Sequence, residues 1–239
     1  MHLTKYLKTV NWLTILLFYG MILLGTYFAR KLPNLLNLLL EQITEIPFSF
    51  NYNHGFVTLV AALLFYQFSN QKQEISLLGN RKIKSLLFPL ILFTAYVTYG
   101  IRNNHEVNEH LWAFMFCGFA LLYNIMEEYA WRGYLIDSMG KINVVIKSII
   151  SGLFWAFWHL LVFNNFDQYG GFWIFLIFCL VFSFLLTFAV LRTKSILVAA
   201  TLHAFIIQTN LVALFCLVGF IVLLLTWDRN IIKQRNKTN

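Results

Sequence analysis

The run LWAFMFCGFALLYNIM at residues 111–126 passes directly into EEYAWRG at residues 127–133, and this junction decides the fold. The first stretch is apolar enough to lie in a membrane, whereas the second sets two carboxylates and an arginine at its end. A charged side chain at the centre of a bilayer costs roughly 3 kcal/mol or more, so such groups usually face a bundle interior, where they pair or carry function. We therefore expect a helical membrane protein that contains a buried polar site.

The composition of the whole chain is that of a membrane protein. Hydrophobic residues make up 59% and charged residues 12% of the 239 residues, which is too apolar for a soluble domain of this length. Several apolar runs reach the length of about 20 residues that crosses the bilayer core. They cover roughly residues 10–29, 54–68, 85–101, 111–139, 142–163, 172–191, 195–209 and 211–227. The predicted fold is an all-α, polytopic transmembrane bundle of about eight helices with a polar cavity within the bilayer.

The basic residues predict the orientation of this bundle, because Lys and Arg accumulate in the cytoplasmic loops of membrane proteins. A cytoplasmic N-terminus leaves only three of the 18 basic residues outside, namely Arg30, Lys31 and Arg102. We therefore expect both termini in the cytoplasm, and substrate entry from the cytoplasm or laterally from the lipid. The net charge of +8 then indicates topology and attraction to anionic lipid, and nucleic-acid binding is the weaker interpretation.

No repeat, low-complexity tract or long hydrophilic linker divides the chain. We expect one integral membrane domain over residues 1–239, with a first helix that is retained and not cleaved. A basic cytoplasmic tail is expected over residues 228–239. The richness in Lys, Asn, Ile and Phe is typical of a membrane protein from an AT-rich bacterial genome, which predicts the bacterial cell membrane as its location. The sequence gives no indication of an oligomeric state.

Two histidines interrupt later apolar runs: His159 in LFWAFWHLL at residues 153–161 and His203 in LVAATLHAF at residues 197–205. A lone buried histidine most often only hydrogen-bonds to a neighbouring helix. Two of them in separate helices, with Glu127 in a third, form a set that can activate water, either directly or through a divalent metal such as zinc. Glu127, His159 and His203 are therefore the candidate catalytic residues and the candidate metal ligands.

The residues that follow Glu127 predict how its neighbours behave. Glu128 and Arg132 are four residues apart, so on a helix they share a face and can form a charge-assisted pair that lowers the cost of burying both. Glu127 points about 100° away and stays free for another partner. Gly133 would allow a second helix to approach closely. In the alternative interpretation, the helix ends near residue 126 and these charged residues lie at the membrane interface.

Three further histidines, His54, His105 and His110, lie in or beside polar segments. On the predicted topology they are outside or at the outer interface, and their polar neighbours indicate solvated loops. His105 and Glu109 are four residues apart, as metal ligands sometimes are, but a single such pair is a weak signal. We keep all three histidines out of the predicted site.

Taken together, three motifs resemble the CAAX protease and bacteriocin-processing family of intramembrane endopeptidases, also called the Abi family. They are EEYAWRG at residues 127–133, the aromatic-rich helix with WH at residues 158–159, and the later helix that carries His203. The resemblance covers a core of roughly residues 111–225. It implies an eight-helix membrane bundle that encloses a cavity, with the catalytic groups inside the bilayer.

The same resemblance implies roles for individual residues. Glu127 corresponds to the glutamate that activates the attacking water, and Glu128 and Arg132 orient it. His159 and His203 bind the water or a metal ion and polarise the scissile carbonyl. The implied substrates are membrane-associated peptides or proteins: prenylated C-termini for eukaryotic members, and secreted peptides, pheromones or bacteriocins for bacterial members.

The chain departs from the family pattern at two positions. The family usually has Phe four residues before the first histidine, where this chain has Trp155, so an aromatic ring is kept. It usually has Asn four residues after the second histidine, where this chain has Ile207. Losing one hydrogen-bond donor of an oxyanion hole slows an enzyme by about 10²–10³-fold. Asn210, one turn further along, is the candidate substitute. The predicted supporting residues are Glu128, Arg132, Trp155 and Asn210.

Three classes of function remain open. The first is an intramembrane endopeptidase that hydrolyses a peptide bond of a membrane-associated peptide or protein. The second is a non-catalytic binder, such as an immunity or assembly protein that uses the same cavity, and the isoleucine at position 207 favours it. The third is a transporter or proton relay, because buried Glu and His also mark ion paths. The absence of repeated halves in the sequence disfavours this third class.

Overall fold

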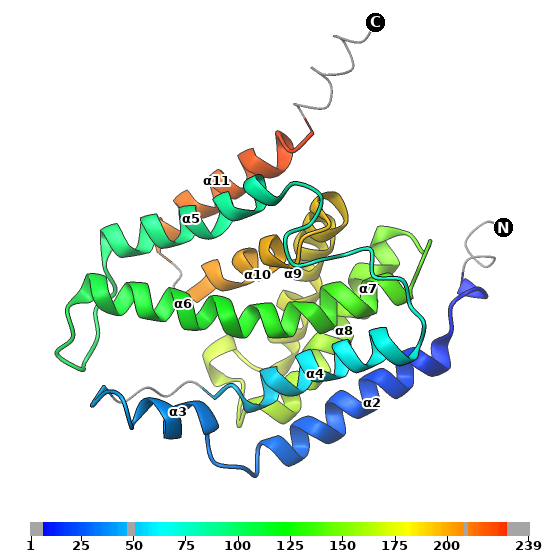
Figure 1. The fold of residues 1–239 in the computed structure, drawn as a ribbon, viewed down its shortest axis with the longest axis horizontal. Coiled ribbons are helices and arrows are strands. Elements are labelled where there is room, and N and C mark those ends of the chain that lie inside the picture. Colours follow the sequence, from blue (N-terminus) through cyan, green and yellow to red (C-terminus); the bar gives the residue numbers. More distant parts are fainter. Residues whose placement is uncertain (1–6, 47–50, 208–209, 229–239) are drawn as a thin grey trace, which may run out of the picture.

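The computed structural model describes residues 7–46, 51–207 and 210–228 of the 239-residue chain, and every regular element in these ranges is helical. The predicted all-α bundle is therefore confirmed (Figure 1). Four helices are long and apolar enough to cross a membrane, judged by length and composition. They are α2 (Trp12–Ala29), α5 (Lys82–Tyr99), α8 (Val144–Val162) and α9 (Phe172–Thr193).

The remaining elements are shorter or less apolar, and two of the longer ones, α4 and α6, contribute to the candidate site described below. In chain order they are α3 (Leu35–Leu40), α4 (Asn53–Phe68), α6 (Glu109–Glu128), the π-helix η1 (Tyr129–Tyr134), α7 (Leu135–Ser138), the 3₁₀-helix η2 (Asp167–Tyr169), α10 (Ile196–Ala204), the 3₁₀-helix η3 (Phe205–Ile207) and α11 (Leu211–Leu225).

Most of these bounds agree with the predicted apolar runs to within a few residues. Two runs are built differently. The run 111–139 is divided into α6, η1 and α7, and the run 195–209 stops being α-helical at Ala204. The predicted basic tail lies outside the described residues, apart from Asp228.

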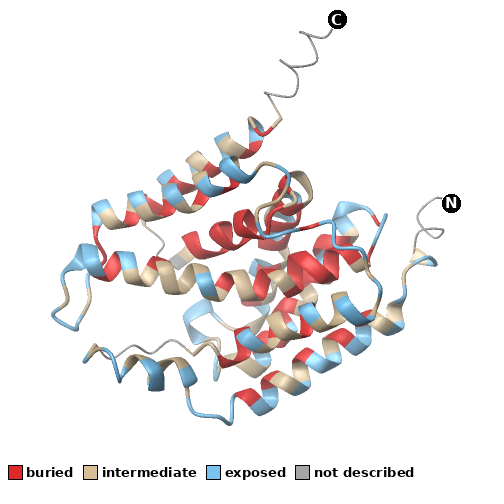
Figure 2. Ribbon diagram, in the orientation of Figure 1, coloured by how far each residue is buried: buried red, intermediate tan, exposed pale blue. Residues whose placement is uncertain are grey.

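Helix α10 lies in the middle of the bundle and is buried along its whole length. It contacts α5, α6 and α9, and Figure 1 shows it between the α5–α11 pair and α6. In Figure 2 the buried positions concentrate on α10, on the last two residues of α6 and on η1. A helix that is apolar on every side has to be covered on every side. The residues of α10, and most of those of η1, are therefore shielded from solvent and lipid.

Hydrogen bonds show which helix ends meet at one end of the bundle. The Arg30 guanidinium, just after α2, donates to the carbonyl oxygen of Leu161 and, over 2.8 Å, to Asn164 Oδ1 at the end of α8. The side-chain amide of Asn53, at the start of α4, donates to the Ala29 carbonyl oxygen over 3.3 Å. This end of the bundle, which we call the outer end, thus joins the end of α2, the start of α4 and the end of α8.

The opposite end of the bundle is joined by a second set of contacts. Lys84 Nζ donates to the carbonyl oxygens of Thr226 and Trp227 over 3.0 and 2.9 Å, which ties the start of α5 to the end of α11. The Ser76 backbone N–H donates to the Lys194 carbonyl oxygen over 2.9 Å, which ties the α4–α5 connection to the start of α10. We call this end the basic end, because most of the described Lys and Arg residues lie there.

Candidate active site

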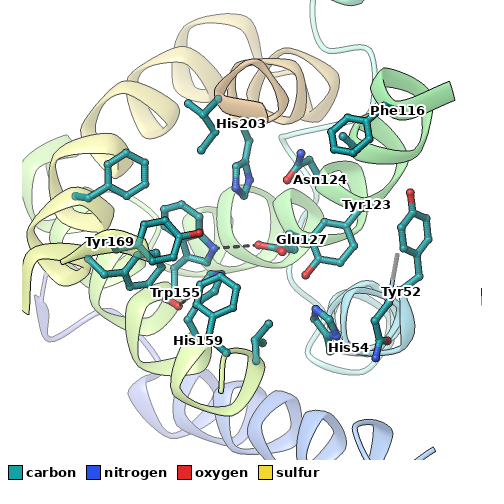
Figure 3. A pocket seen from close by; sticks show the side chains of 17 residues that line it. Tyr52, His54, Phe116, Tyr123, Asn124, Glu127, Trp155, His159, Tyr169 and His203 are labelled. Atoms are coloured by element: carbon teal, nitrogen blue, oxygen red, sulfur yellow. Dashed lines mark hydrogen bonds between the residues drawn. The ribbon is translucent and has the colours of Figure 1, made fainter. Parts of the chain in front are cut away.

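A cavity of about 750 Å³ lies among α4, α6, α8, α9 and α10, and Figure 3 shows the side chains that line it. Glu127 from α6, His159 from α8 and His203 from α10 all line this cavity, and so does Trp155. Each of these four side chains belongs to a buried residue. The structure therefore brings together the candidate residues that are far apart in the sequence, while their catalytic roles remain a prediction.

The Glu127 carboxylate is held by an aromatic donor from a second helix, α8. Trp155 Nε1 donates to Glu127 Oε2 over 2.9 Å, which is the dashed contact in Figure 3. Tyr123, one turn earlier on α6, lines the same part of the cavity. Charge-assisted hydrogen bonds of this kind are stronger than neutral ones and fix the position of a carboxylate. Trp155, where the family usually has Phe, thus supplies a hydrogen bond that a phenyl ring lacks.

The predicted pair between Glu128 and Arg132 is present and fully buried, with 3.1 Å between Arg132 Nη1 and Glu128 Oε1. The other guanidinium nitrogen, Nη2, donates to Ser183 Oγ on α9 over 2.7 Å. The Glu128 carboxylate has a further partner on α10. Its Oε1 atom lies 2.9 Å from His203 Nδ1. In this geometry the Glu128–Arg132 pair contacts His203 and Trp155 contacts Glu127, while the roles implied by the family resemblance stay a prediction.

These contacts determine which ring nitrogen of each histidine is available. An ionised carboxylate only accepts hydrogen bonds, so His203 Nδ1 carries a proton and donates to Glu128. A backbone carbonyl also only accepts, so His159 Nδ1 carries a proton and donates to the Trp155 carbonyl oxygen over 2.8 Å. In both residues the second nitrogen, Nε2, is left for a ligand in the cavity. The hydrogen bond made by one ring nitrogen of a histidine thus determines which nitrogen is available to a ligand.

The π-helix η1 begins directly after the two carboxylates. Its residues include Arg132 and Gly133, both buried. A Cβ atom added to Gly133 would lie 3.2 Å from Ile196 Cδ1 on α10 and 3.5 Å from the Tyr66 hydroxyl oxygen on α4. Gly133 therefore permits the close helix approach that the sequence predicted. Wide π-helical turns inside α-helices are frequent at functional sites.

The structure adds three residues to the predicted site: His54, Tyr123 and Asn124 line the cavity as well. The prediction that His54 lies in a solvated loop is wrong, because α4 begins at Asn53 and His54 is a buried residue of its first turn. Asn124 precedes Glu127 by three residues on α6, so the helical spacing could have identified it. His105 and His110 are exposed, as predicted.

Asn210 does not occupy the position predicted for it. Helix α10 ends at Ala204, so Asn210 is not one turn further along the helix that carries His203. It is instead the N-cap of α11, where its Oδ1 atom accepts a hydrogen bond from the Ala213 backbone N–H over 3.1 Å. The side chain of Ile207 lies outside the described part of the structure.

The predicted metal ligands can be compared with the arrangement of the side chains. Within residues 7–46, 51–207 and 210–228, no group of three or more His, Cys, Asp or Glu side chains is arranged so that it could hold a metal ion. Glu127, His159 and His203 share the cavity without forming a ligand set in this geometry. The nitrogen and oxygen ligands of zinc lie about 2.0–2.2 Å from the ion. A zinc site built from these three side chains therefore stays a prediction.

Comparisons with known proteins show which family this part of the chain resembles. Residues 108–207 match the family described as type II CAAX prenyl endopeptidase Rce1-like. A curated relative, CAAX prenyl protease 2 of Methanococcus maripaludis, is 32% identical over 100 residues, which cover 38% of this chain and 37% of that protein. The chain thus aligns with little more than a third of this relative, and no solved structure matches. The resemblance to the CAAX protease family is confirmed over this region, which holds all three candidate catalytic residues.

Proposed function

We propose that this chain is an intramembrane endopeptidase of the CAAX protease type, which hydrolyses a peptide bond of a membrane-associated peptide or protein. One observation carries the proposal: Glu127, His159 and His203, from three separate helices, line a single buried cavity. Two further observations support it. The family match includes all three residues, and each has a partner that fixes its orientation.

The proposed reaction starts with a water molecule between Glu127 and the substrate carbonyl. Glu127 takes a proton from this water, and the water oxygen attacks the carbonyl carbon. The electron pair of the carbonyl bond moves to the carbonyl oxygen, which gives a tetrahedral intermediate. When the carbon–nitrogen bond breaks, the proton held by Glu127 passes to the leaving nitrogen. The products are a carboxylic acid and an amine, and the glutamate is regenerated.

Two side chains can stabilise the negative charge on the oxygen of the intermediate. His203, protonated on both nitrogens, would donate from Nε2 while its Nδ1 proton stays with Glu128. In that state Glu127 and Glu128 are balanced by Arg132 and His203, so the buried group has no net charge. Asn124 is the second donor, because it is a buried residue whose side chain lines the cavity and makes no hydrogen bond to another described residue. Its amide would serve where the family has the asparagine that Ile207 replaces.

His159 has a different task. Its Nδ1 proton is committed to the Trp155 carbonyl oxygen, so a neutral ring offers the Nε2 lone pair to the cavity. That lone pair can accept a hydrogen bond from the attacking water or from the substrate N–H. Zinc remains a candidate cofactor for the same residues if they rearrange, and no step above depends on it.

The proposal is tested by the rate at which purified protein in liposomes cleaves a labelled library of membrane-anchored peptides. Glu127→Gln should abolish cleavage, because general acid–base catalysis contributes about 10²–10⁴-fold. Glu109→Gln is the matched control, since Glu109 lies on the same helix, is exposed and should tolerate the change. A chelator added to the wild-type assay tests the metal separately. Cleavage that survives Glu127→Gln would reject the assignment of Glu127.

A non-catalytic binding, immunity or assembly protein is the second candidate, and the isoleucine at position 207 favours it. A binder transfers no proton, so its cellular activity should survive Glu127→Gln as long as the protein remains folded. Cellular activity that survives this change, with no cleavage by any variant, would replace the enzyme with the binder.

A further inference from the structure

The cavity extends from the middle of the bundle toward one end only. Its lining includes Tyr52, the N-cap of α4, and Phe163 and Tyr169, which lie in the connection between α8 and α9. Hydrogen bonds from Arg30 and Asn53 join these same helix ends at the outer end of the bundle. The lining includes no residue from the connections at the basic end. The mouth of the cavity is therefore at the outer end.

Packed side chains close the cavity on the other side. On the side of Glu127 that faces the basic end lies a fully buried layer, which consists of Glu128, Arg132 and Ser183. Between this layer and the basic end, Tyr134 and other residues of η1 and α7 are also fully buried. The Tyr134 hydroxyl donates to Ser69 Oγ over 3.2 Å, which ties this packing to the end of α4. A peptide could reach Glu127 from the outer end without unfolding the bundle, and could not do so from the basic end.

The two ends differ in the number of basic side chains that they carry. This distribution agrees with the one predicted from the sequence. In the described part of the chain, the basic residues at the outer end are Arg30, Lys31 and Arg102. Those at or next to the basic end are Lys8, Lys72, Arg81, Lys82, Lys84, Lys141, Lys147, Arg192 and Lys194. Membrane insertion leaves Lys and Arg preferentially on the cytoplasmic side. The basic end is thus the cytoplasmic end.

We infer that the cavity opens away from the cytoplasm and that its substrate is a peptide presented from the non-cytoplasmic side of the membrane. The second half of this inference rests on the proposed function. It replaces the expectation from sequence that substrates enter from the cytoplasm. The structure separates two features that the charge pattern alone could not: most basic side chains lie at one end, whereas the cavity opens at the opposite end.

The side chains at the mouth indicate what kind of peptide this is. Tyr52, Phe163, Tyr169 and Phe175 line the outer part of the cavity. Tyrosine and tryptophan favour the membrane–water interface, where one part of the ring is apolar and the hydroxyl or N–H is wet. A peptide anchored at the outer leaflet, with apolar side chains beside the scissile bond, matches this lining. A soluble, strongly charged peptide does not.

Cysteine labelling tests the orientation without any measurement of cleavage. Asn104→Cys places a thiol on the exposed α5–α6 connection at the outer end, and Gln73→Cys places one on the exposed α4–α5 connection at the basic end. The three native cysteines are buried, so the wild type is the background control. In intact cells, a membrane-impermeant maleimide should label Asn104→Cys, whereas Gln73→Cys should be labelled only after permeabilisation. The reverse pattern would overturn the inference.

Cleavage in oriented vesicles tests the substrate. Proteoliposomes whose protein orientation is assigned with the same two cysteine variants receive a labelled, lipid-anchored peptide on the outside only. Cleavage should occur when the outer end faces the peptide and should be lost when the basic end faces it. Cleavage only from the basic end would reject the inferred substrate side. No cleavage from either side, with the labelling pattern intact, would reject the proposed function and leave the orientation standing.

Discussion

At the scale of single residues, the site depends on Glu128 as much as on the residues that face the cavity. Its Oε1 atom is shared between Arg132 Nη1 and His203 Nδ1, at 3.1 and 2.9 Å. The guanidinium also lies over the Trp155 ring, 4.9 Å from the ring centroid. One buried carboxylate thus connects the arginine, the histidine of α10 and, through the arginine, the tryptophan that holds Glu127. A substitution at any of these residues should therefore alter the positions of the other side chains.

Removing the arginine from this group should destabilise the fold. Arg132→Ala leaves the Glu128 carboxylate buried without its cation, and breaking a buried pair in this way costs about 3–5 kcal/mol. The matched control is Arg192→Ala, because the Arg192–Asp228 pair, at 3.2 Å, is partly exposed and pairs of that kind contribute about 0–1 kcal/mol. Thermal unfolding in detergent measures both. Equal stability of the two variants would contradict a structural role for the buried pair.

Asn124 should matter for turnover and little for folding. Asn124→Leu keeps a similar volume and removes an amide that bonds to no other described residue, so thermal stability should stay close to wild type. A donor that acts mainly on the transition state changes kcat more than KM. We expect kcat to fall by about 10²–10³-fold with KM nearly unchanged. A rise in KM alone would show that Asn124 binds substrate and does not stabilise the oxyanion.

At the scale of helices, apolar runs predicted where elements begin and end, because a segment of about 20 apolar residues has few other stable states in a bilayer. The length of an apolar run does not show how two of these runs, 111–139 and 195–209, are divided into separate helices. The run 111–139 contains the π-helix η1, where Arg132 reaches both Glu128 and Ser183 and Gly133 meets α10. Such tertiary contacts select a π-turn over an α-turn, and the run's composition is the same in either case.

The two misplaced residues have the same kind of cause. Asn210 was assigned to the helix of His203 on the assumption that the apolar run 195–209 is one helix, yet α10 ends at Ala204. His54 was assigned to a loop because polar residues surround it, yet it is a buried residue near the start of α4. In contrast, the Glu128–Arg132 pair follows from local helical spacing and was predicted correctly. Local spacing was readable from the sequence, whereas the point at which a buried helix stops was not.

Close packing around η1 leads to a prediction about Gly133. Gly133→Leu places a side chain where the first added carbon already lies 3.2 Å from Ile196 Cδ1, so the Ile196 side chain, or α10 with it, has to move. Overpacking of this kind costs about 1–3 kcal/mol, and a shift of α10 also displaces His203. Gly20→Leu on α2 is the matched control, since a Cβ atom there meets nothing within 4 Å. Thermal unfolding in detergent should show a loss for Gly133→Leu only. A similar loss at Gly20 would indicate a general cost of replacing glycine.

At the scale of the whole molecule, the bundle has two unlike ends. The basic end is tied together by Lys84, Ser76 and the Trp227 indole, which donates to Asn80 Oδ1 over 3.0 Å. The outer end holds the mouth of the cavity between the start of α4 and the α8–α9 connection. The sequence was sufficient to predict the separation of charge between these ends. It could not predict which end is open, because that depends on how five helices tilt around Glu127.

This asymmetry predicts that a bulky group will inhibit cleavage at one end only. Tyr169 lines the mouth and is 36% exposed, so the thiol of Tyr169→Cys is reachable and a polymer-linked maleimide attached there should obstruct peptide entry. The same reagent on Gln73→Cys lies at the basic end, away from the cavity lining, and should leave the rate near wild type. Each unmodified variant is assayed alongside its modified form in detergent, where both ends are accessible. Inhibition through Gln73→Cys with none through Tyr169→Cys would mean that peptides reach Glu127 from the basic end. Equal inhibition through both would point instead to a general effect of the polymer on the bundle.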